Sequence, residues 1–388
     1  MIFAKKGEIM GNMNLIKDMP KKLGFGCMRL PIIGDKTENI DFDTFSKMVD
    51  TFMGQGFTYF DTAYPYHNEK SEEAVRKCLV ERYPRDSFLL ADKMPVWLVK
   101  TNEDYQKIFD TQLERTGATY FDFYLLHVLN KERFDFLQET GGFEFGTKMK
   151  AEGKVKNFGF SFHDSAEVLD EILTAHPEVD FVQLQINYFD WNSINVQSGD
   201  CYAVAEKHNV PIIVMEPVKG GTLANLIGKP AELLQELNPE ASYASYAIRF
   251  VASLPNVMMV LSGMSTMEQM LDNTSYMKDF VPLTSKEKDV IKKVTSALEE
   301  MKSIRCTSCQ YCVKGCPKQI RIPSIFTVYN MSMQFGITDS IRRQYREVTG
   351  EERGKASDCI ACGKCEQQCP QHLPIRELLK EVTSSLEE

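Results

Sequence analysis

The sequence predicts an α/β protein, a (β/α)₈ TIM barrel followed by a small, mainly α-helical domain. Three observations lead to this expectation. Short apolar segments alternate with amphipathic ones from about residue 19 to residue 283. This stretch has roughly the 250 residues that eight strand–helix units need. Eight of the eleven cysteines then fall between residues 306 and 369, where the composition changes.

Eight segments have the length and apolar character of buried parallel strands. They are residues 23–28, 57–60, 88–91, 121–126, 155–160, 181–186, 212–215 and 257–261. Between them, residues 42–53, 72–82 and 105–113 carry apolar side chains at helical spacing. A doubly wound open sheet is the alternative fold, but no Gly-x-Gly-x-x-Gly follows the first strand. We therefore expect the barrel.

The pattern divides the chain into four parts. They are an N-terminal extension (residues 1–18), the barrel (19–283), a connecting helix (284–301) and the cysteine-rich domain (302–388). Met10 and Met13 are alternative starts, which is why the first residues are expected to stand apart from the barrel. Thr284 or Ser285 can cap the connecting helix, with Glu287 in its first turn.

Composition and charge argue against several classes of protein. The chain has 388 residues and a net charge of −9, and 43% of its residues are apolar, as in ordinary globular proteins. The acidic balance argues against nucleic-acid binding. No apolar run approaches the roughly 20 residues of a membrane span. The first residues lack the apolar core of a signal peptide. We therefore expect a cytoplasmic protein with neither a nucleic-acid nor a membrane partner.

The clustered cysteines form two runs of the pattern Cys-x₂-Cys-x₂-Cys-x₃-Cys-Pro. The first run is Cys306, Cys309, Cys312 and Cys316, and the second is Cys359, Cys362, Cys365 and Cys369. The doubled motif resembles that of bacterial two-cluster ferredoxins, in which the last thiolate of each run serves the other [4Fe–4S] cluster. One cluster would then take the first three cysteines of the first run with Cys369. The other would take the first three of the second run with Cys316. Two zinc sites are the alternative, but zinc usually needs only cysteine pairs.

Residues 317–358, between the two runs, are more than a minimal ferredoxin hairpin needs. They include helical stretches at 325–335 and 338–347. The tail therefore resembles the α-helical variant of the two-cluster ferredoxins. Two clusters in tandem imply electron transfer, and a structural role is the alternative.

Polar residues stand where the predicted strands end. Asp61, Lys93, His127 and Ser161 follow the second to fifth strands, and Tyr66 lies in the loop after Asp61. Chemistry in a (β/α)₈ barrel takes place at this end of the strands. One such residue is usually structural, but four on four consecutive units are hard to obtain by chance.

These residue types suit proton transfer to a carbonyl group. Tyr66 is a proton donor with an unperturbed pKa of ~10, which the Lys93 ammonium is expected to lower. Asp61 would keep Lys93 charged and oriented, and His127 would polarise the carbonyl oxygen. Together they would protonate a developing alkoxide while hydride arrives from elsewhere.

Local motifs here resemble those of the aldo-keto reductase family over roughly residues 19–283. They are Phe-Asp-Thr-Ala-x-x-Tyr at 60–66, Ser-Glu at 71–72, Tyr-Leu-Leu-His at 124–127 and Gly-Phe-Gly-Cys-Met at 24–28. Asp61, Tyr66, Lys93 and His127 match the family's tetrad. The resemblance implies a barrel that binds NAD(P)H across its mouth. With its tail, the whole chain resembles the ferredoxin-fused branch of that family.

The resemblance also implies a set of cofactor contacts. Ser161 and Gln183 would contact the nicotinamide amide, although Phe162 stands where the family has Asn. Met215 would pack on the nicotinamide ring in place of the family's Tyr. A pyrophosphate could be cradled by Lys219, Gly220 and Gly221, for which an ordinary flexible loop is the alternative.

The adenosine end departs from the family pattern in charge. Members selective for NADPH place cations at positions that correspond to Gly263 and Gln269, while Asn273 matches the adenine contact. A 2′-phosphate would lack ionic partners here. If the cofactor is a nicotinamide, we therefore expect NAD(H) to be used at least as well as NADP(H).

These observations predict an iron-sulfur oxidoreductase that reduces a small carbonyl compound, or oxidises an alcohol, and passes single electrons through two [4Fe–4S] clusters. Hydride carries two electrons, so coupling needs a flavin, a radical or sequential transfers, and the sequence shows no flavin motif. A ferredoxin or flavodoxin-type protein is the candidate electron partner. One alternative is a plain NAD(P)H carbonyl reductase with a structural or redox-sensing tail. The other is a non-catalytic electron-transfer subunit, against which the intact tetrad argues.

Overall fold

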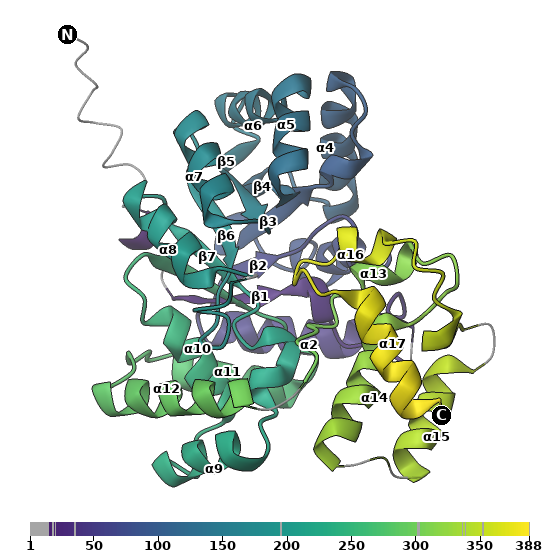
Figure 1. Cartoon of the computed structure of the whole chain (residues 1–388). Coiled ribbons are helices and arrows are strands. Elements are labelled where there is room, and N and C mark those ends of the chain that lie inside the picture. Colours follow the sequence, from purple (N-terminus) through teal and green to yellow (C-terminus); the bar gives the residue numbers. More distant parts are fainter. Residues whose placement is uncertain are drawn as a thin grey trace.

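The structure is a computed structural model that describes residues 15–17, 19, 21–34, 36–194, 196–300, 303–335, 337, 339–350 and 353–387. Figure 1 shows the strands of a barrel near the centre of the molecule and the yellow-green helices of the tail beside it. Most of the expected N-terminal extension, residues 1–14 and 18, lies outside the described residues. The described Leu15, Ile16 and Met19 pack against the apolar interior of the barrel.

Eight parallel strands form a closed barrel in sequence order. They are β1 (Leu23–Gly26), β2 (Tyr59–Asp61), β3 (Leu89–Met94), β4 (Phe121–Leu129), β5 (Val155–Phe162), β6 (Phe181–Gln185), β7 (Ile212–Met215) and β8 (Val257–Ser262). Each strand pairs in parallel with the next, and β8 returns to β1. The predicted (β/α)₈ fold class is confirmed, and the open sheet is excluded.

Alternation along each strand decides which side chains enter the barrel. In β2, Phe60 packs outward on Phe52, with ring centroids 5.4 Å apart. Its neighbour Tyr59 packs inward on Phe123 from β4, at 5.1 Å. Asp61 follows Phe60, so it faces inward again at the carboxyl end of the strand.

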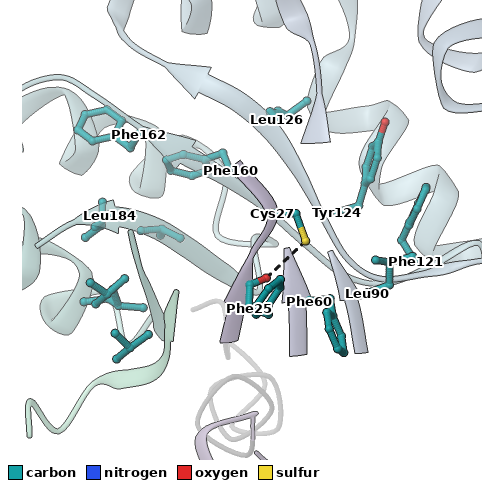
Figure 2. Packing of buried hydrophobic residues seen from close by; sticks show 14 of the residues in the cluster. Phe25, Cys27, Phe60, Leu90, Phe121, Tyr124, Leu126, Phe160, Phe162 and Leu184 are labelled. Carbon is teal, nitrogen blue, oxygen red and sulfur yellow. Dashed lines mark hydrogen bonds between the residues drawn. The ribbon is translucent and has the colours of Figure 1, made fainter. Parts of the chain in front are cut away.

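Figure 2 shows the apolar layer that lies between the strands and the surrounding helices. Successive strands β1 to β5 contribute the buried side chains Phe25, Phe60, Leu90, Tyr124 and Phe160. Burial of a side chain of this size stabilises the fold by roughly 1.5–3 kcal/mol. This layer therefore fixes the strand positions, and with them the residues at the strand ends.

Helices cover the outside of the barrel. They are α2 (Phe42–Gly54), α3 (Ser71–Val75), α4 (Asn102–Thr116), α5 (Lys131–Thr140), α6 (Gly142–Ala151), α7 (Ala166–Ala175), α8 (Ser198–Lys207), α9 (Gly228–Leu237), α10 (Tyr243–Ala252) and α11 (Met267–Met277). Helix α2 begins after Asp41, whose side chain accepts a hydrogen bond from the Thr44 amide at 3.0 Å. The segment 72–82, predicted as one helix, is divided between α3 and a π-helical turn, η2 (Arg76–Val80).

Helix α12 (Ser285–Glu300) connects the barrel to the tail, as predicted. Thr284 and Glu287 cap it reciprocally. The Thr284 amide donates to the Glu287 carboxylate at 2.7 Å, and the Glu287 amide donates to the Thr284 hydroxyl at 3.2 Å. One face of α12 buries Ile291, Val294 and Leu298 in an apolar cluster shared with α9.

The tail is helical in its described residues and has an apolar core of its own. Its helices are α13 (Tyr311–Lys314), α14 (Ile322–Phe335), α15 (Asp339–Thr349), α16 (Lys364–Gln367) and α17 (Ile375–Leu386). Ile325 and Phe326 from α14 pack with Tyr345 from α15 and with Leu379 and Val382 from α17. The expected mainly α-helical tail is confirmed. Among the described residues, no helix combines the length and the apolar character that crossing a bilayer requires.

Candidate active site between the barrel and the cysteine-rich tail

The four residues of the predicted tetrad lie together at the barrel mouth. The Lys93 ammonium on β3 donates to the Asp61 carboxylate at 2.6 Å and to the Thr62 carbonyl oxygen at 2.8 Å. It also lies 3.1 Å from the Tyr66 hydroxyl. Lys93 is fully buried. The ammonium is therefore fixed by one ion pair and two further hydrogen bonds, and one of its partners is the phenol.

His127 completes this group from β4. Its ring stands edge-on to the Tyr66 ring, with centroids 6.0 Å apart. Burial lowers the pKa of His127 well below its usual value, and the nearby Lys93 ammonium lowers it further. Its Nδ1 atom is buried without a hydrogen-bond partner among the described residues. A neutral imidazole of this kind can donate one hydrogen bond to a carbonyl oxygen.

The pKa of Tyr66 shifts against the sequence-based expectation. Burial raises the pKa of the Tyr66 phenol well above its usual value, and the Asp61 carboxylate adds to this effect. Arg29 opposes the shift without reversing it. The expected lowering by Lys93 was wrong as a net result, because it left out the desolvation of the phenolate. The phenol therefore keeps its proton, which is the form that can protonate an alkoxide.

A bulge in β4 sets the position of His127. The pairing of β4 with β5 shifts register between Leu126 and Leu129. Inside the bulge, Val128 has a φ of 60°, a rare conformation for a β-branched residue. Its amide donates to the Ser161 hydroxyl at 2.7 Å, and its carbonyl oxygen accepts from Arg133 at 2.6 Å. Strain of this kind persists only where its surroundings hold it, and it is common at functional sites.

The predicted nicotinamide contacts face a small cavity of about 70 Å³. Ser161, Gln183, Met215 and Gly263 line it together with the tetrad residues Asp61, Tyr66 and His127. The Gln183 amide donates to the Asp61 carboxylate at 3.1 Å, so it orients the ion pair. Pockets for cofactors and drug-sized ligands typically have about 300–1,000 Å³. By itself this cavity is therefore smaller than such a pocket, but it shares the lining residues Tyr66, His163 and Cys309 with a larger cavity.

The segment expected to cradle a pyrophosphate lies against the tail instead. The Lys219 ammonium is buried and contacts both oxygens of Asp190, at 2.8 and 2.7 Å. It also donates to the Gln371 side chain of the tail at 3.0 Å. A Cβ added at Gly220 would overlap the backbone oxygen of Thr307, whereas one at Gly221 would meet only Asn225, at 3.8 Å.

Further contacts hold the tail across the barrel mouth. Arg29 donates to the Thr307 carbonyl oxygen at 3.0 Å and pairs with Glu216 at 3.3 Å. The Gln371 amide donates to the Gln185 side chain at 2.9 Å, and both residues are buried. The segments around residues 307 and 371 therefore cover the place where the family resemblance put the cofactor.

The residues expected at the adenosine end have partners on or beside α11. Gln269 accepts a hydrogen bond from the Ser265 amide at 2.8 Å. Asn273 donates to the Ser262 hydroxyl at 2.8 Å and accepts from the Tyr276 hydroxyl at 2.6 Å. In this arrangement, the side chains expected at the adenosine end bond to one another, and the tail lies over the expected nicotinamide position.

The structure brings cysteines from the two runs close to one another. One cavity is lined by Cys316, Cys359, Cys362 and Cys365. Burial raises the pKa of the Cys312 thiol, and the nearby thiols Cys309, Cys306 and Cys369 raise it further. Among the residues that the structure describes, no three His, Cys, Asp or Glu side chains converge closely enough for a single metal ion. Four sulfurs around a common space are the donor set of a [4Fe–4S] cluster.

The two runs share one backbone conformation. The second residue after the first cysteine has positive φ in both, Ser308 at 54° and Ala361 at 56°. The fourth residue does as well, Gln310 at 68° and Gly363 at 76°, and a one-turn helix follows in each case, α13 and α16. These left-handed residues fold each run around its own sulfurs.

A second cavity, of about 1,330 Å³, lies between the barrel and the tail. The barrel lines it with Tyr66, Trp97, Arg133 and His163, and the tail lines it with Cys309, Tyr311, Cys369 and His372. It therefore joins the phenol of the tetrad to one of the two cysteine sets. Sequence reasoning missed Arg133, His163 and Tyr311, because no local motif marks them. A hint for His163 was its place two residues after Ser161.

Comparison with known proteins agrees with this architecture. Residues 22–296 match the model of the Aldo/keto reductase family, which is more than half of the chain. The chain belongs to the aldo/keto reductase family. Residues 305–373 match the model of the 4Fe-4S dicluster domain. This aldo/keto reductase is therefore an oxidoreductase of that family with a C-terminal iron-sulfur domain.

Individual relatives match the barrel of this aldo/keto reductase. An uncharacterized oxidoreductase of Bacillus subtilis, YqkF, is 23% identical over 282 residues, which are 65% of this chain and 85% of that protein. The uncharacterized oxidoreductase C215.11c of Schizosaccharomyces pombe is 24% identical over 265 residues, 65% of this chain and 80% of that protein. An aldo-keto reductase of Klebsiella pneumoniae, solved with NADPH, aligns with a TM-score of 0.58 at 19% identity. The alignment covers 71% of this chain and 90% of the Klebsiella pneumoniae chain.

Proposed function

We propose that this aldo/keto reductase reduces a small carbonyl compound to an alcohol, or catalyses the reverse oxidation, with Tyr66 as the proton donor or acceptor. We propose further that it exchanges electrons through two [4Fe–4S] clusters. The observation that carries the proposal is the shared cavity of about 1,330 Å³, which Tyr66 and the cluster cysteines Cys309 and Cys369 line together. The site of proton transfer therefore adjoins a site of electron transfer.

Each member of the tetrad has a distinct task in this proposal. The Tyr66 phenol, whose pKa burial raises, gives its proton to the developing alkoxide. The neutral His127 donates a hydrogen bond to the same oxygen and orients the carbonyl. Lys93, held by Asp61 at 2.6 Å, stabilises the phenolate that remains. Water that reaches the cavity then restores the proton to Tyr66.

The cysteines would hold the clusters in two interlocked sets. One set is Cys306, Cys309, Cys312 and Cys369, and the other is Cys359, Cys362, Cys365 and Cys316. When bound, a [4Fe–4S] cluster supplies or accepts one electron at a time. Carbonyl reduction by single electrons requires two electrons and two protons. Tyr66 would supply the proton to oxygen, water in the cavity would supply the proton to carbon, and two clusters would match the electron count of one turnover.

Hydride transfer from a nicotinamide is the second candidate. Membership in the family favours it, and the Klebsiella pneumoniae relative was solved with NADPH. It requires the tail to move away from the mouth, because Lys219 and Gly220 face Gln371 and Thr307 in this arrangement. If the mouth opens, NADH should bind at least as well as NADPH, since neither Gly263 nor Gln269 offers a cation to a 2′-phosphate.

The test uses the full chain with its clusters assembled under anaerobic conditions. Alcohol formation from a panel of aldehydes and ketones is measured with reduced methyl viologen, NADH or NADPH as the only reductant. Viologen-supported turnover that Tyr66→Phe abolishes is the expected result. Turnover with NADH or NADPH alone would support the nicotinamide route. Turnover by Tyr66→Phe at the wild-type rate would remove the phenol from the mechanism. If no reductant supports any turnover, the chain is an electron-transfer subunit.

A further inference from the structure

The cavity between the barrel and the tail contains a positively charged side chain with no acidic partner. Residues 22–296 contain seven arginines. Six of them pair with a carboxylate: Arg29, Arg76, Arg82, Arg85, Arg115 and Arg249. Among the described residues of that range, Arg133 is the exception, and it lines the cavity of about 1,330 Å³. The exception therefore lies where a ligand can reach it.

The contacts of Arg133 leave most of its donors unused. One nitrogen, Nη1, donates to the Val128 carbonyl oxygen at 2.6 Å. The guanidinium also lies 5.6 Å from the centre of the Trp97 ring. A guanidinium has five N–H donors in a flat fork that matches a carboxylate or a phosphate. Burial lowers the pKa of Arg133, a sign that the charge has lost hydration without gaining an ionic partner.

The groups around Arg133 also suit an oxygen-rich ligand. Burial, with smaller contributions from Arg133 and His372, lowers the pKa of His163 to about 3, so that imidazole is neutral. The Nδ1 atoms of His127 and His163 have no hydrogen-bond partner among the described residues. The rings of His127 and Trp97 are 5.3 Å apart. Trp97 therefore links the tetrad to Arg133 across a distance that a small molecule can span.

The charges at the rim of the cavity favour an anion as well. Lys314 and Lys364 of the tail line the same cavity, and neither has a carboxylate partner in the described part of the chain. Of the acidic residues that line it, Glu69 pairs with Arg115. Glu38 is exposed. Among the side chains that line the cavity, the unpaired interior charge is therefore positive and comes from Arg133, while a cluster held by Cys309 and Cys369 would add negative charge on the tail side.

We propose that Arg133 binds an oxyanion of the substrate, so that the carbonyl compound reduced at Tyr66 also carries a carboxylate or a phosphate. This inference rests on the proposed function for the identity of the reacting group, but the anion site itself can be tested by binding alone. The flat fork holds the oxyanion, Trp97 packs beside the chain that joins it to the carbonyl, and the tetrad receives the carbonyl. An oxo acid or a phosphorylated aldehyde has this composition.

A purely structural role for Arg133 predicts a different outcome. In that case its contact with Val128 only stabilises the bulge that carries His127, and the anion of a ligand has no effect. Arg133→Gln separates the two roles, because the amide can still donate to the Val128 oxygen but has no charge. Arg76→Gln is the matched control, since Arg76 pairs with Glu81 on the exposed side of the barrel.

The experiment measures binding of three aldehydes of similar size to the cluster-loaded full chain by anaerobic calorimetry. The probes are 4-carboxybenzaldehyde, its neutral methyl ester and 4-formylphenyl phosphate. We expect one or both anions to bind about ten- to a hundredfold more tightly than the ester, the usual scale for a charge-assisted hydrogen bond. The preference should fall to near one in Arg133→Gln and persist in Arg76→Gln. Whichever anion binds more tightly identifies the natural group.

Two results would overturn the inference. One is equal binding of the acids and the ester by the wild-type chain. The other is an equal loss for all three probes in Arg133→Gln, which the structural role predicts. Tyr66→Phe keeps this test independent of the proposed function. That variant should lose turnover and retain the preference for anions. A wild-type chain that shows no turnover but a clear anion preference would instead refute the carbonyl chemistry and leave the anion site standing.

Discussion

The two cysteine runs have the same backbone conformation, but the first is covered by the barrel and the second is more exposed. Ser308 and Ala361 share a left-handed conformation, as do Gln310 and Gly363. Yet Thr307, in the first run, is 2% exposed and contacts the barrel, whereas Ile360, at the matching position of the second run, is 58% exposed. Likewise Cys309 faces the cavity of the tetrad, and Cys362 is exposed.

The difference shows how one motif can serve two tasks. The spacing of the cysteines and the left-handed conformations are the same in both runs, so we assign them to the proposed cluster binding. The residues between the cysteines differ, and they decide what surrounds each cluster. Thr307 and Tyr311 adapt the first run, the inner run, to the barrel. Ile360 and Lys364 leave the second run, the outer run, facing solvent, where an electron partner can approach.

The largest expected effect concerns the phenol beside the inner run. Tyr66→Phe should lower carbonyl turnover by ~10²–10⁴-fold, the usual scale for general acid catalysis, and leave the iron content unchanged. Tyr83→Phe is the control, because the Tyr83 hydroxyl is exposed and bonds only Asp50. Steady-state rates and iron analysis check both variants. If Tyr66→Phe stayed active, the phenol beside the inner run would not be the proton donor.

The next effect tests the exposure of the two sets. Loaded protein should contain about eight iron and eight acid-labile sulfide atoms per chain. Ferricyanide should destroy the outer cluster first, because Cys362 is exposed and Cys312 is buried. Iron release should therefore pause near half of the total, with the spectrum of one cluster remaining. A single phase of release, or stoichiometric zinc in place of iron, would contradict this expectation.

A glycine substitution in each region gives a smaller contrast. Gly220→Ala should destabilise the chain by roughly 1–3 kcal/mol beyond the backbone strain, because its Cβ would overlap the Thr307 oxygen of the inner run. Gly363→Ala in the outer run should cost only about 1–2 kcal/mol, the strain of a left-handed residue, since nothing lies within 4 Å of its Cβ. Denaturant unfolding of the loaded protein compares them. Equal losses would mean that Thr307 is not held against the barrel.

The smallest effect is a rate of carbonyl reduction at the tetrad that hardly changes with pH. A lowered pKa leaves His127 neutral at every pH above it, and a raised pKa leaves Tyr66 protonated at every pH below it. Neither group should change charge between about pH 6 and pH 8. The rate of carbonyl reduction under single-turnover conditions should vary less than about twofold in that range. An inflection near pH 6.5 that a His127 variant removes would show that the imidazole is hydrated.

Local patterns were enough to predict the barrel and the tetrad. Apolar runs marked all eight strands, and Asp61, Lys93 and His127 stand where those strands end, so a repeating fold brings them together. The same reasoning could not predict the hydrogen-bond partners of Lys219. Asp190 precedes Lys219 by 29 residues and Gln371 follows it by 152. The contact of the Lys219 ammonium with the Gln371 side chain therefore exists only after the tail has packed on the barrel.

Burial was the second quantity that the sequence did not reveal. Lys93 beside Tyr66 suggested a lowered pKa, because an attraction between two named residues can be inferred from a motif. The desolvation that outweighs it depends on how completely the tail covers the mouth. The isolation of Arg133 was hidden in the same way, since an arginine without a partner looks like any other arginine until its neighbours are known.

The buried contacts of Gln371 make the joining of the two domains hard to reverse. Its side chain bonds both Gln185 and Lys219 of the barrel. A foreign ferredoxin that covered this mouth without an amide at position 371 would leave the Gln185 oxygen and one Lys219 donor buried without their tail partner, at about 1–3 kcal/mol for each. A fusion that began as a convenient tether between two genes would thereby become an obligate pairing. Exchange of tails between members of such a lineage should then succeed only when residues 185, 219 and 371 are exchanged together.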